Sequence, residues 1–184
     1  MKLFSLLFHS RDFHRQLEQH RPSLYRVAYA WCHDATLSED LVQETLAKAL
    51  DKSSQLRDPQ LLQSWLFSIL SNCWRDHFRR LRNLDNLEEI DEARLVSDFN
   101  LEDEHARNQL VSRVRTAIAD LPMGQRQVVT LVDLEEFSYN QVAEILDIPI
   151  GTVMSRLCRA RKELKSMLIG QQQDWLQAPI RRVK

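Results

Sequence analysis

The sequence contains few of the residues that make turns, loops and covalent cross-links. Only 3 glycines and 5 prolines occur in its 184 residues, which disfavours a turn-rich β-sandwich or barrel. Its 3 cysteines, Cys32, Cys73 and Cys158, are far apart and lack C-x-x-C spacing, which argues against a disulfide framework or a four-ligand zinc site. Cys73 and His77 lie one helical turn apart, but two ligands make a poor metal site. We therefore expect ordinary helix cysteines in a reducing compartment, and neither metal nor cofactor.

Long apolar runs are also missing. The apolar stretch at residues 1–8 is too short for a signal-peptide core and lacks a small-residue cleavage site. No later run approaches the roughly 18 apolar residues that span a bilayer, so we expect a cytoplasmic protein. Leu, Ala, Arg, Glu and Gln dominate instead, and all are good helix formers. With 43% hydrophobic and 28% charged residues, the composition excludes wholesale disorder.

The formal net charge of −1 hides a strong segregation of charge along the chain. Two clusters are basic: Arg75, Arg79, Arg80 and Arg82, and then Arg156, Arg159, Arg161, Lys162 and Lys165. Between them, residues 85–104 are rich in Asp and Glu. Two basic patches separated by an acidic connector predict two contact sites for a polyanion such as DNA, with weak intrinsic affinity.

Apolar residues recur at helical spacing in most of the chain. The predicted helical stretches are residues 13–50 with an interruption at 34–40, then 61–81, 108–121, 125–134, 138–146 and 150–169. Pro22 marks a helix start or bend, and Thr36 or Ser38 is the expected N-cap of the next helix. No strand pattern of convincing length occurs.

These stretches predict an all-α fold with two small helical domains. We place the domains at residues 1–82 and 108–170, joined by an acidic linker at 83–107 with room for a turn or two of helix, and followed by a frayed tail at 171–184. The linker is poor in large apolar residues, so we expect the domains to change their relative arrangement at little energetic cost.

Residues 138–157 have the pattern of a helix-turn-helix. Ala143 gives the small residue needed where the two helices cross, and Asp147 tolerates the left-handed backbone of the turn better than most residues. Val153 and Leu157 are spaced to bury one face of the second helix against the first. The opposite face is then free to enter a major groove of DNA.

The free face of this second helix carries the predicted DNA contacts. They are Thr152, Met154, Ser155, Cys158, Arg159 and Lys162, with Arg156 and Arg161 at the flanks. Arg159 is the candidate for a forked hydrogen bond to guanine, whereas Arg156 and Arg161 are candidates for phosphate contacts. An amphipathic helix with a solvated basic face is the alternative interpretation.

These residues also resemble a known family. Residues 148–164 are similar to the recognition helix of extracytoplasmic-function sigma factors, I-P-x-G-T-V-x-S-R-L-x-R-A-R. Leu121 and Pro122, followed by Arg126 and Val129, resemble the L-P-x-x-x-R-x-V signature that opens the same domain. Glu136 stands where the family commonly has glycine.

The N-terminal half resembles the same family through two further motifs. Residues 40–45 are similar to the D-x-V-Q-E-x-F element that docks on the polymerase clamp, and residues 64–80 to the element that contacts minus-ten DNA. The resemblance implies that the polymerase-binding residues are Asp40, Gln43 and Glu44. It implies minus-ten contacts by Trp65, Asn72, Arg75, Arg79 and Arg80. For Trp65, packing in the core is favoured over base stacking. For Asp40, Gln43 and Glu44, an ordinary solvated helix face remains the alternative interpretation.

The resemblance implies that the chain is a sigma factor and not an enzyme. Region 2 would occupy the first domain and region 4 the second, which would read the minus-thirty-five element. The expected partners are core RNA polymerase (through its β′ clamp helices and β flap), promoter DNA and an anti-sigma factor, with no small-molecule substrate. The acidic linker would thread the RNA channel of the polymerase.

Other readings explain less of the sequence. A stand-alone repressor or response-regulator output domain would account for the helix-turn-helix but not for the N-terminal motifs, and binding to core polymerase separates these two classes. A purely structural helical adaptor would show no promoter-specific binding. An enzyme is disfavoured because the chain has no phosphate-cradling glycine loop and no pairing of a nucleophile with a base.

Overall fold

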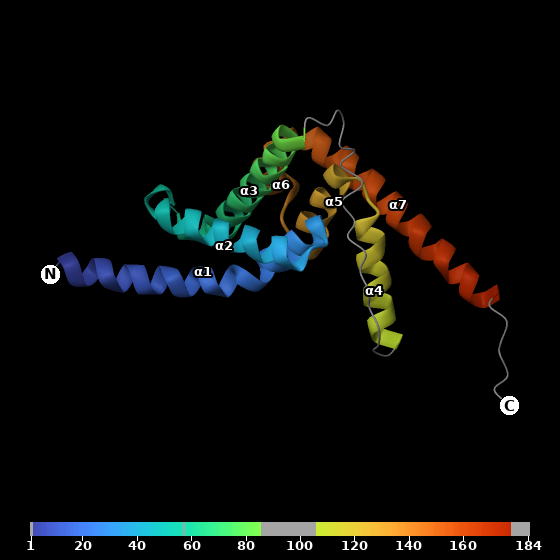
Figure 1. Ribbon diagram of the computed structural model, residues 1–184, viewed down its shortest axis with the longest axis horizontal. Helices are drawn as coiled ribbons and strands as arrows, with labels where there is room; N and C mark the ends of the chain where they lie inside the picture. The colour runs from blue at the N-terminus through green and yellow to red at the C-terminus, as the bar shows by residue number, and fades with distance from the viewer. Residues whose placement is uncertain (1, 57, 86–105, 178–184) are drawn as a thin grey trace.

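The computed structural model describes residues 2–56, 58–85 and 106–177, and within these ranges it is helical without any strand (Figure 1). Its α-helices are α1 (Lys2–Cys32), α2 (Ala35–Asp51), α3 (Leu62–Asp85), α4 (Ala106–Ala119), α5 (Met123–Val129), α6 (Tyr139–Leu146) and α7 (Ile150–Gln177). Short 3-10 turns at Ser53–Gln55 and Pro59–Leu61 precede α3, and one π-helical turn, Thr130–Leu134, follows α5. The predicted all-α fold is confirmed.

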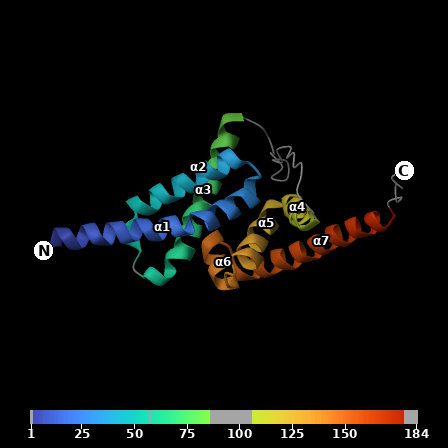
Figure 2. The ribbon, with the colours of Figure 1, turned by 90° about the horizontal axis from the view of Figure 1, so that it is seen from below.

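Helices α1, α2 and α3 form a first helical unit. Figures 1 and 2 show α1 and α2 side by side, with α3 crossing them. Apolar side chains of all three helices are buried between them, including Trp31, Val42 and Phe67. Trp65 is half-buried and packs against this core, in agreement with core packing as its favoured role.

The corner between α1 and α2 differs from the expected one. Asp34 is the N-cap of α2, because its carboxylate accepts a hydrogen bond from the backbone N–H of Leu37. Ser38 is buried inside the helix and donates its hydroxyl to the carbonyl of Asp34. The expectation of a cap at Thr36 or Ser38 is therefore wrong, as is a helix start at Pro22, which lies inside α1.

Helices α4 to α7 form a second helical unit that contains the predicted helix-turn-helix. Ser138 caps α6 through a reciprocal capping box with Gln141. Asp147 adopts the left-handed conformation at the turn (φ 55°, ψ 51°), and Val153 and Leu157 of α7 are buried. The sequence therefore predicted both the turn residue and the buried face correctly.

The helices extend further than the sequence pattern indicated. Helix α3 continues to Asp85 and α4 begins at Ala106, so both enter the range predicted as linker; the rest of that linker lies outside the described residues. Helix α7 continues past Ile169 to Gln177, which corrects the expectation of a frayed tail for residues 171–177.

The turn before α6 contains an unfavourable backbone conformation. Glu136 has φ 59°, in the left-handed region, where a residue with a Cβ atom is about 1–2 kcal/mol less favourable than in right-handed geometry. The turn thus keeps the conformation that suits the glycine common at this position in the resembling family, although the side chain has changed.

We expect Glu136→Gly to raise the free energy of unfolding by about 0.5–1 kcal/mol, because relief of the left-handed strain exceeds the extra chain entropy of glycine. Urea unfolding of the full chain followed by circular dichroism measures this change. Glu144→Gly is the matched control: Glu144 lies on an exposed position inside α6, and the change should lower stability by about 0.5–1 kcal/mol. A loss of stability in both variants would contradict strain at Glu136.

Candidate nucleic-acid interface

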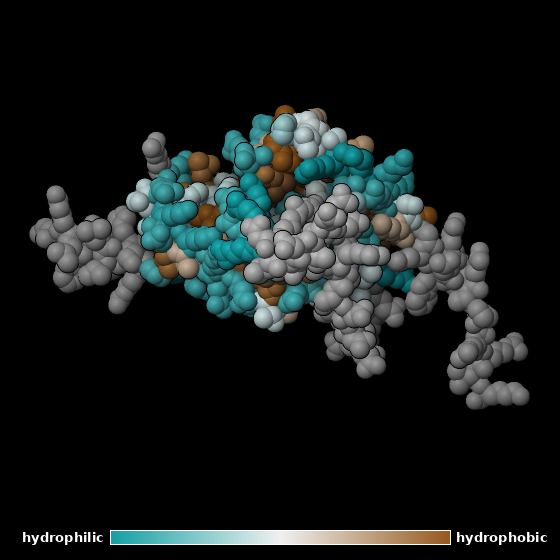
Figure 3. Space-filling view, turned by 45° about the horizontal axis from the view of Figure 1, so that its top comes forward, coloured by the Kyte–Doolittle hydropathy of each residue, from teal (hydrophilic) through white to brown (hydrophobic). Residues whose placement is uncertain are grey.

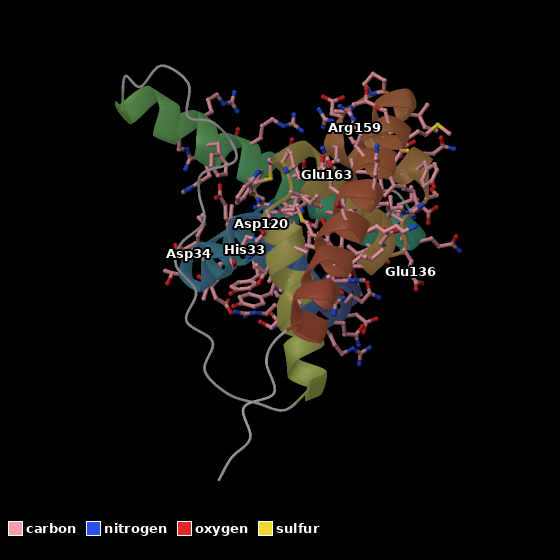
Figure 4. All side chains as sticks on the ribbon, turned by 90° about the vertical axis from the view of Figure 1, so that its right-hand side faces the viewer. His33, Asp34, Asp120, Glu136, Arg159 and Glu163 are labelled. Carbon is pink, nitrogen blue, oxygen red and sulfur yellow. The ribbon has the colours of Figure 1, made fainter. Side chains whose placement is uncertain are left out.

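The outer face of α7 brings together most of the side chains predicted to read DNA. Met154 is 54% exposed, and Ser155, Cys158, Arg159 and Lys162 are also exposed, whereas Thr152 is half-buried. Arg159 lies against its own helix and donates from Nε to the carbonyl of Ser155 at 3.2 Å. Figure 4 shows Arg159 on α7, well apart from the corner of α1 and α2 where His33 and Asp34 lie.

The two flanking arginines of α7 are held differently from Arg159. Arg161 forms an ion pair with Asp133, with Nη2 2.6 Å from Oδ1, and this hydrogen-bonded pair raises the pKa of Arg161. Arg156 is half-buried and covers Gly124, where an added Cβ would lie 2.9 Å from the guanidinium carbon. Arg156 therefore lies against the start of α5, within its own helical unit.

The predicted polymerase contacts lie on α2. Asp40 and Gln43 are exposed, and Glu44 is half-buried. Glu44 forms an ion pair with Lys48, with Oε1 2.8 Å from Nζ, and Lys48 also lies 3.8 Å from a carboxylate oxygen of Asp76 on α3. This acidic face is accessible in the structure, and Lys48 fixes one of its carboxylates.

The predicted minus-ten contacts lie on the part of α3 that borders the second helical unit. Asn72, Arg75, Arg79 and Arg80 are exposed. Arg75 donates from Nη2 to the carbonyl of Leu146, the last residue of α6, at 3.3 Å. Arg79 pairs with Asp76 on its own helix. One candidate DNA-contacting side chain thus binds the helix-turn-helix itself.

A buried seam joins the two units, and its main polar group is Arg126 of α5. Its Nη1 donates to the carbonyl of Trp31 at 2.8 Å, and its Nη2 donates to the carbonyls of Leu121, at 2.9 Å, and Ala119. Burial lowers the pKa of Arg126 to about 10, which leaves it protonated at neutral pH. The indole N–H of Trp31 donates back across the seam to Thr130 Oγ1 at 2.8 Å.

Apolar and ionic contacts extend the seam. Phe67 of α3 meets Phe137 edge to face, with ring centroids 5.1 Å apart, and Arg26 of α1 pairs with the nearly buried carboxylate of Glu135 at 2.7 Å. Burial and the cation of Arg126 together lower the pKa of His33 to about 4. This interface opposes the free rearrangement of the two units that the linker composition led us to expect.

Sequence reasoning did not identify the seam. Arg126 entered the prediction only as part of a motif, although a lone arginine among the apolar positions of a short helix signals a buried hydrogen-bonding role. Glu135 gave no comparable signal, since acidic residues are common in turns.

The described residues offer little to a metal or a membrane. They contain no group of three His, Cys, Asp or Glu side chains arranged to hold a metal ion. Burial raises the pKa of the Cys32 and Cys73 thiols, and Cys158 is exposed. In the same part of the chain, no helix is both long and apolar enough to span a bilayer. On the face seen in Figure 3, the coloured surface is mostly hydrophilic, with separate hydrophobic patches.

Comparison with known proteins supports the resemblance in both halves. Residues 17–84 match the family model of sigma-70 region 2, and residues 112–164 match that of sigma-70 region 4. An extracytoplasmic-function (ECF) RNA polymerase sigma factor of Rhodopseudomonas palustris, EcfG, is 33% identical over 147 residues, which cover 80% of each chain. The chain belongs to the sigma-70 family, in its ECF group.

Relatives from distant bacteria and a solved structure agree with this membership. The sigma factor SigV of Bacillus subtilis is 26% identical over 83% of this chain and 88% of its own length. The sigma factor RpoE of Bartonella quintana, crystallised with the anti-sigma factor NepR, aligns with a TM-score of 0.73 at 28% identity, covering 86% of this chain and 97% of that one. This protein is thus a sigma factor for promoter-specific initiation of transcription, a role in which it binds core RNA polymerase and promoter DNA.

Proposed function

We propose that three surfaces of this sigma factor divide the work of initiation. The acidic face of α2, formed by Asp40, Gln43 and Glu44, binds the polymerase clamp. The basic stretch of α3 contacts the minus-ten element during melting, and the outer face of α7 reads the minus-thirty-five element. The observation that carries this proposal is the split of α7 into a buried face, with Val153 and Leu157, and an exposed face that presents Arg159.

We infer that the two units must separate before both promoter elements are contacted. Elements centred roughly 25 base pairs apart lie roughly 85 Å apart at about 3.4 Å per base pair. Here Arg75 lies 3.3 Å from the carbonyl of Leu146, so α3 and the helix-turn-helix are in contact. Because Asp40 and Gln43 are exposed in this closed arrangement, the polymerase docks on α2 first and separation follows.

We further propose that an anti-sigma factor stabilises the closed arrangement. The Bartonella sigma factor, which aligns with the chain over both units, was crystallised with such a partner. A mostly apolar groove of about 700 Å³ runs between α1 and α4. Val111 and Leu134 line this groove and are 45% and 42% exposed. The exposed Arg115 lies beside them, so the groove suits a helix with an apolar face and an acidic flank.

Charge reversal on α2 tests polymerase docking. Asp40→Lys combined with Glu44→Lys should weaken binding to core polymerase at least tenfold, because both carboxylates lie on the proposed contact face. Titration of labelled protein with core polymerase measures the affinity, and circular dichroism checks the fold. Asp51→Lys, an exposed change at the end of the same helix, should leave binding within twofold. Unchanged affinity of the double variant would remove this surface from the proposal.

Replacement of Arg159 tests base reading by α7. Arg159→Ala should lose about 1–3 kcal/mol of minus-thirty-five recognition and relax preference at one or two base pairs, as expected for a forked guanine contact. Arg156→Ala should weaken binding evenly across sequences, as loss of a phosphate contact does. Binding-site selection with holoenzyme measures both effects. Full sequence preference after Arg159→Ala would move base reading to Met154, Ser155 or Cys158.

Recovery of the native complex tests the anti-sigma proposal. Under non-inducing conditions, tagged protein should co-purify with a small partner, and Val111→Asp should reduce its recovery at least fivefold because it places a charge in the apolar groove. Leu61→Asp is the control, since Leu61 is another exposed apolar side chain, 52% exposed, and lies outside the groove. Recovery of polymerase subunits alone would argue against an anti-sigma factor.

A further inference from the structure

A second cavity, which shares no lining residue with the apolar groove, has a different chemistry. Its volume is about 480 Å³, and it opens between α3 and the second helical unit. Arg75 and Arg79 line it from α3, and Arg156 lines it from α7. Arginines from both units therefore face one cavity of the size that holds a small molecule.

Among the residues that the structure describes, the positive charge of this cavity is poorly neutralised. Of the three guanidinium groups, Arg79 has a carboxylate partner in Asp76, and Arg75 binds only the neutral carbonyl of Leu146. In the part of the chain that the structure describes, no ion pair joins Arg75 or Arg156 to an acid. A cleft lined by one sign of charge concentrates the field and attracts counter-ions.

The cavity also has an apolar floor, and at Gly124 it has a position without a side chain, which leaves room for Arg156. Trp74, Phe78 and Ile148 contribute apolar surface to its lining. Gly124 lies under the half-buried Arg156, and a Cβ there would come within 2.9 Å of the guanidinium nitrogen Nη1. The absence of a side chain at Gly124 thus leaves room for the guanidinium of Arg156 at this place.

We propose that this arginine cleft binds a small polyphosphate, which bridges the two units and holds them closed. Guanidinium groups bind phosphate oxygens through paired, charge-assisted hydrogen bonds, so three of them match a chain of two or three phosphates. The ligand is a nucleoside triphosphate, with its base over the apolar floor, or a free polyphosphate. A DNA duplex is too wide for a cavity of this size. The bound polyphosphate competes with promoter DNA for these arginines. This consequence rests on the proposed function, whereas the binding of polyphosphate does not depend on it.

Calorimetric titration of the full chain with sodium tripolyphosphate, in magnesium-free buffer at constant ionic strength, tests the site. Wild-type protein should bind one equivalent, and Arg75→Gln and Arg156→Gln should each weaken binding at least tenfold. Gly124→Ala should also weaken it, because the added Cβ displaces Arg156. Lys165→Gln removes the same charge from an exposed position of α7 outside the cleft, and binding should stay within twofold.

Three results would overturn the proposal. The first is that wild-type protein shows no saturable binding of tripolyphosphate at millimolar concentration. The second is that Lys165→Gln and Arg156→Gln lower the affinity equally. The third is that only variants in one of the two units lower the affinity. A parallel titration with ATP separates the two sources: tighter binding than tripolyphosphate identifies a nucleotide, and equal binding identifies a free polyphosphate. If tripolyphosphate binds as expected but leaves the assembly of free protein, core polymerase and promoter DNA unchanged, the proposed separation of the two units fails while the polyphosphate site stands.

Discussion

The relative position of the two helical units depends on a buried cation. Arg126 is only 3% exposed. A buried charge without hydrogen-bonding partners raises the free energy of the folded state by several kcal/mol. Carbonyl groups provide the partners here, two from the unit that contains Arg126 and one from Trp31 in the other. The third acceptor, the carbonyl of Trp31, places the end of α1 against α5, and the contact of Phe67 with Phe137 joins the same two units.

Two of the carbonyl acceptors of Arg126 lie in its own unit and one lies in the other unit. This distribution determines which hydrogen bonds break when the units separate. If α1 moves away, Arg126 keeps the carbonyls of Ala119 and Leu121 and loses only that of Trp31. The hydrogen bond from the indole N–H of Trp31 to the hydroxyl of Thr130 breaks at the same time, but both groups become accessible to water. Separation leaves Arg126 with two acceptors but breaks the ion pair of Arg26 with Glu135, so the barrier lies in that pair and in apolar contacts such as Phe67 with Phe137.

The sequence predicted local structure well because local structure depends on neighbouring residues. The buried face of α7 follows from the spacing of Val153 and Leu157, and the left-handed turn follows from the tolerance of Asp147 for that conformation. The predicted N-cap of α2 was wrong because several polar residues near Asp34 compete for the same backbone N–H groups. The seam could not be predicted because its partners are far apart in sequence, and a pattern along one helix does not show which other helix covers it. Likewise, Arg75, Arg79 and Arg156 formed two separate basic clusters in the sequence and one cleft in space.

The order of the chain gives the seam a consequence during synthesis. Trp31 precedes Arg126 by 95 residues, so at about 5–20 residues per second a ribosome makes the two roughly 5–20 s apart. The first unit is complete in sequence once Asp85 has been added, so for the roughly 2–8 s before Arg126 is made the surface that α5 will cover faces solvent. Each new molecule therefore passes through an open state before it closes. Under the proposed docking on α2, a nascent chain presents that face to the polymerase with no seam to break, whereas the finished protein presents it with two packed units still to separate.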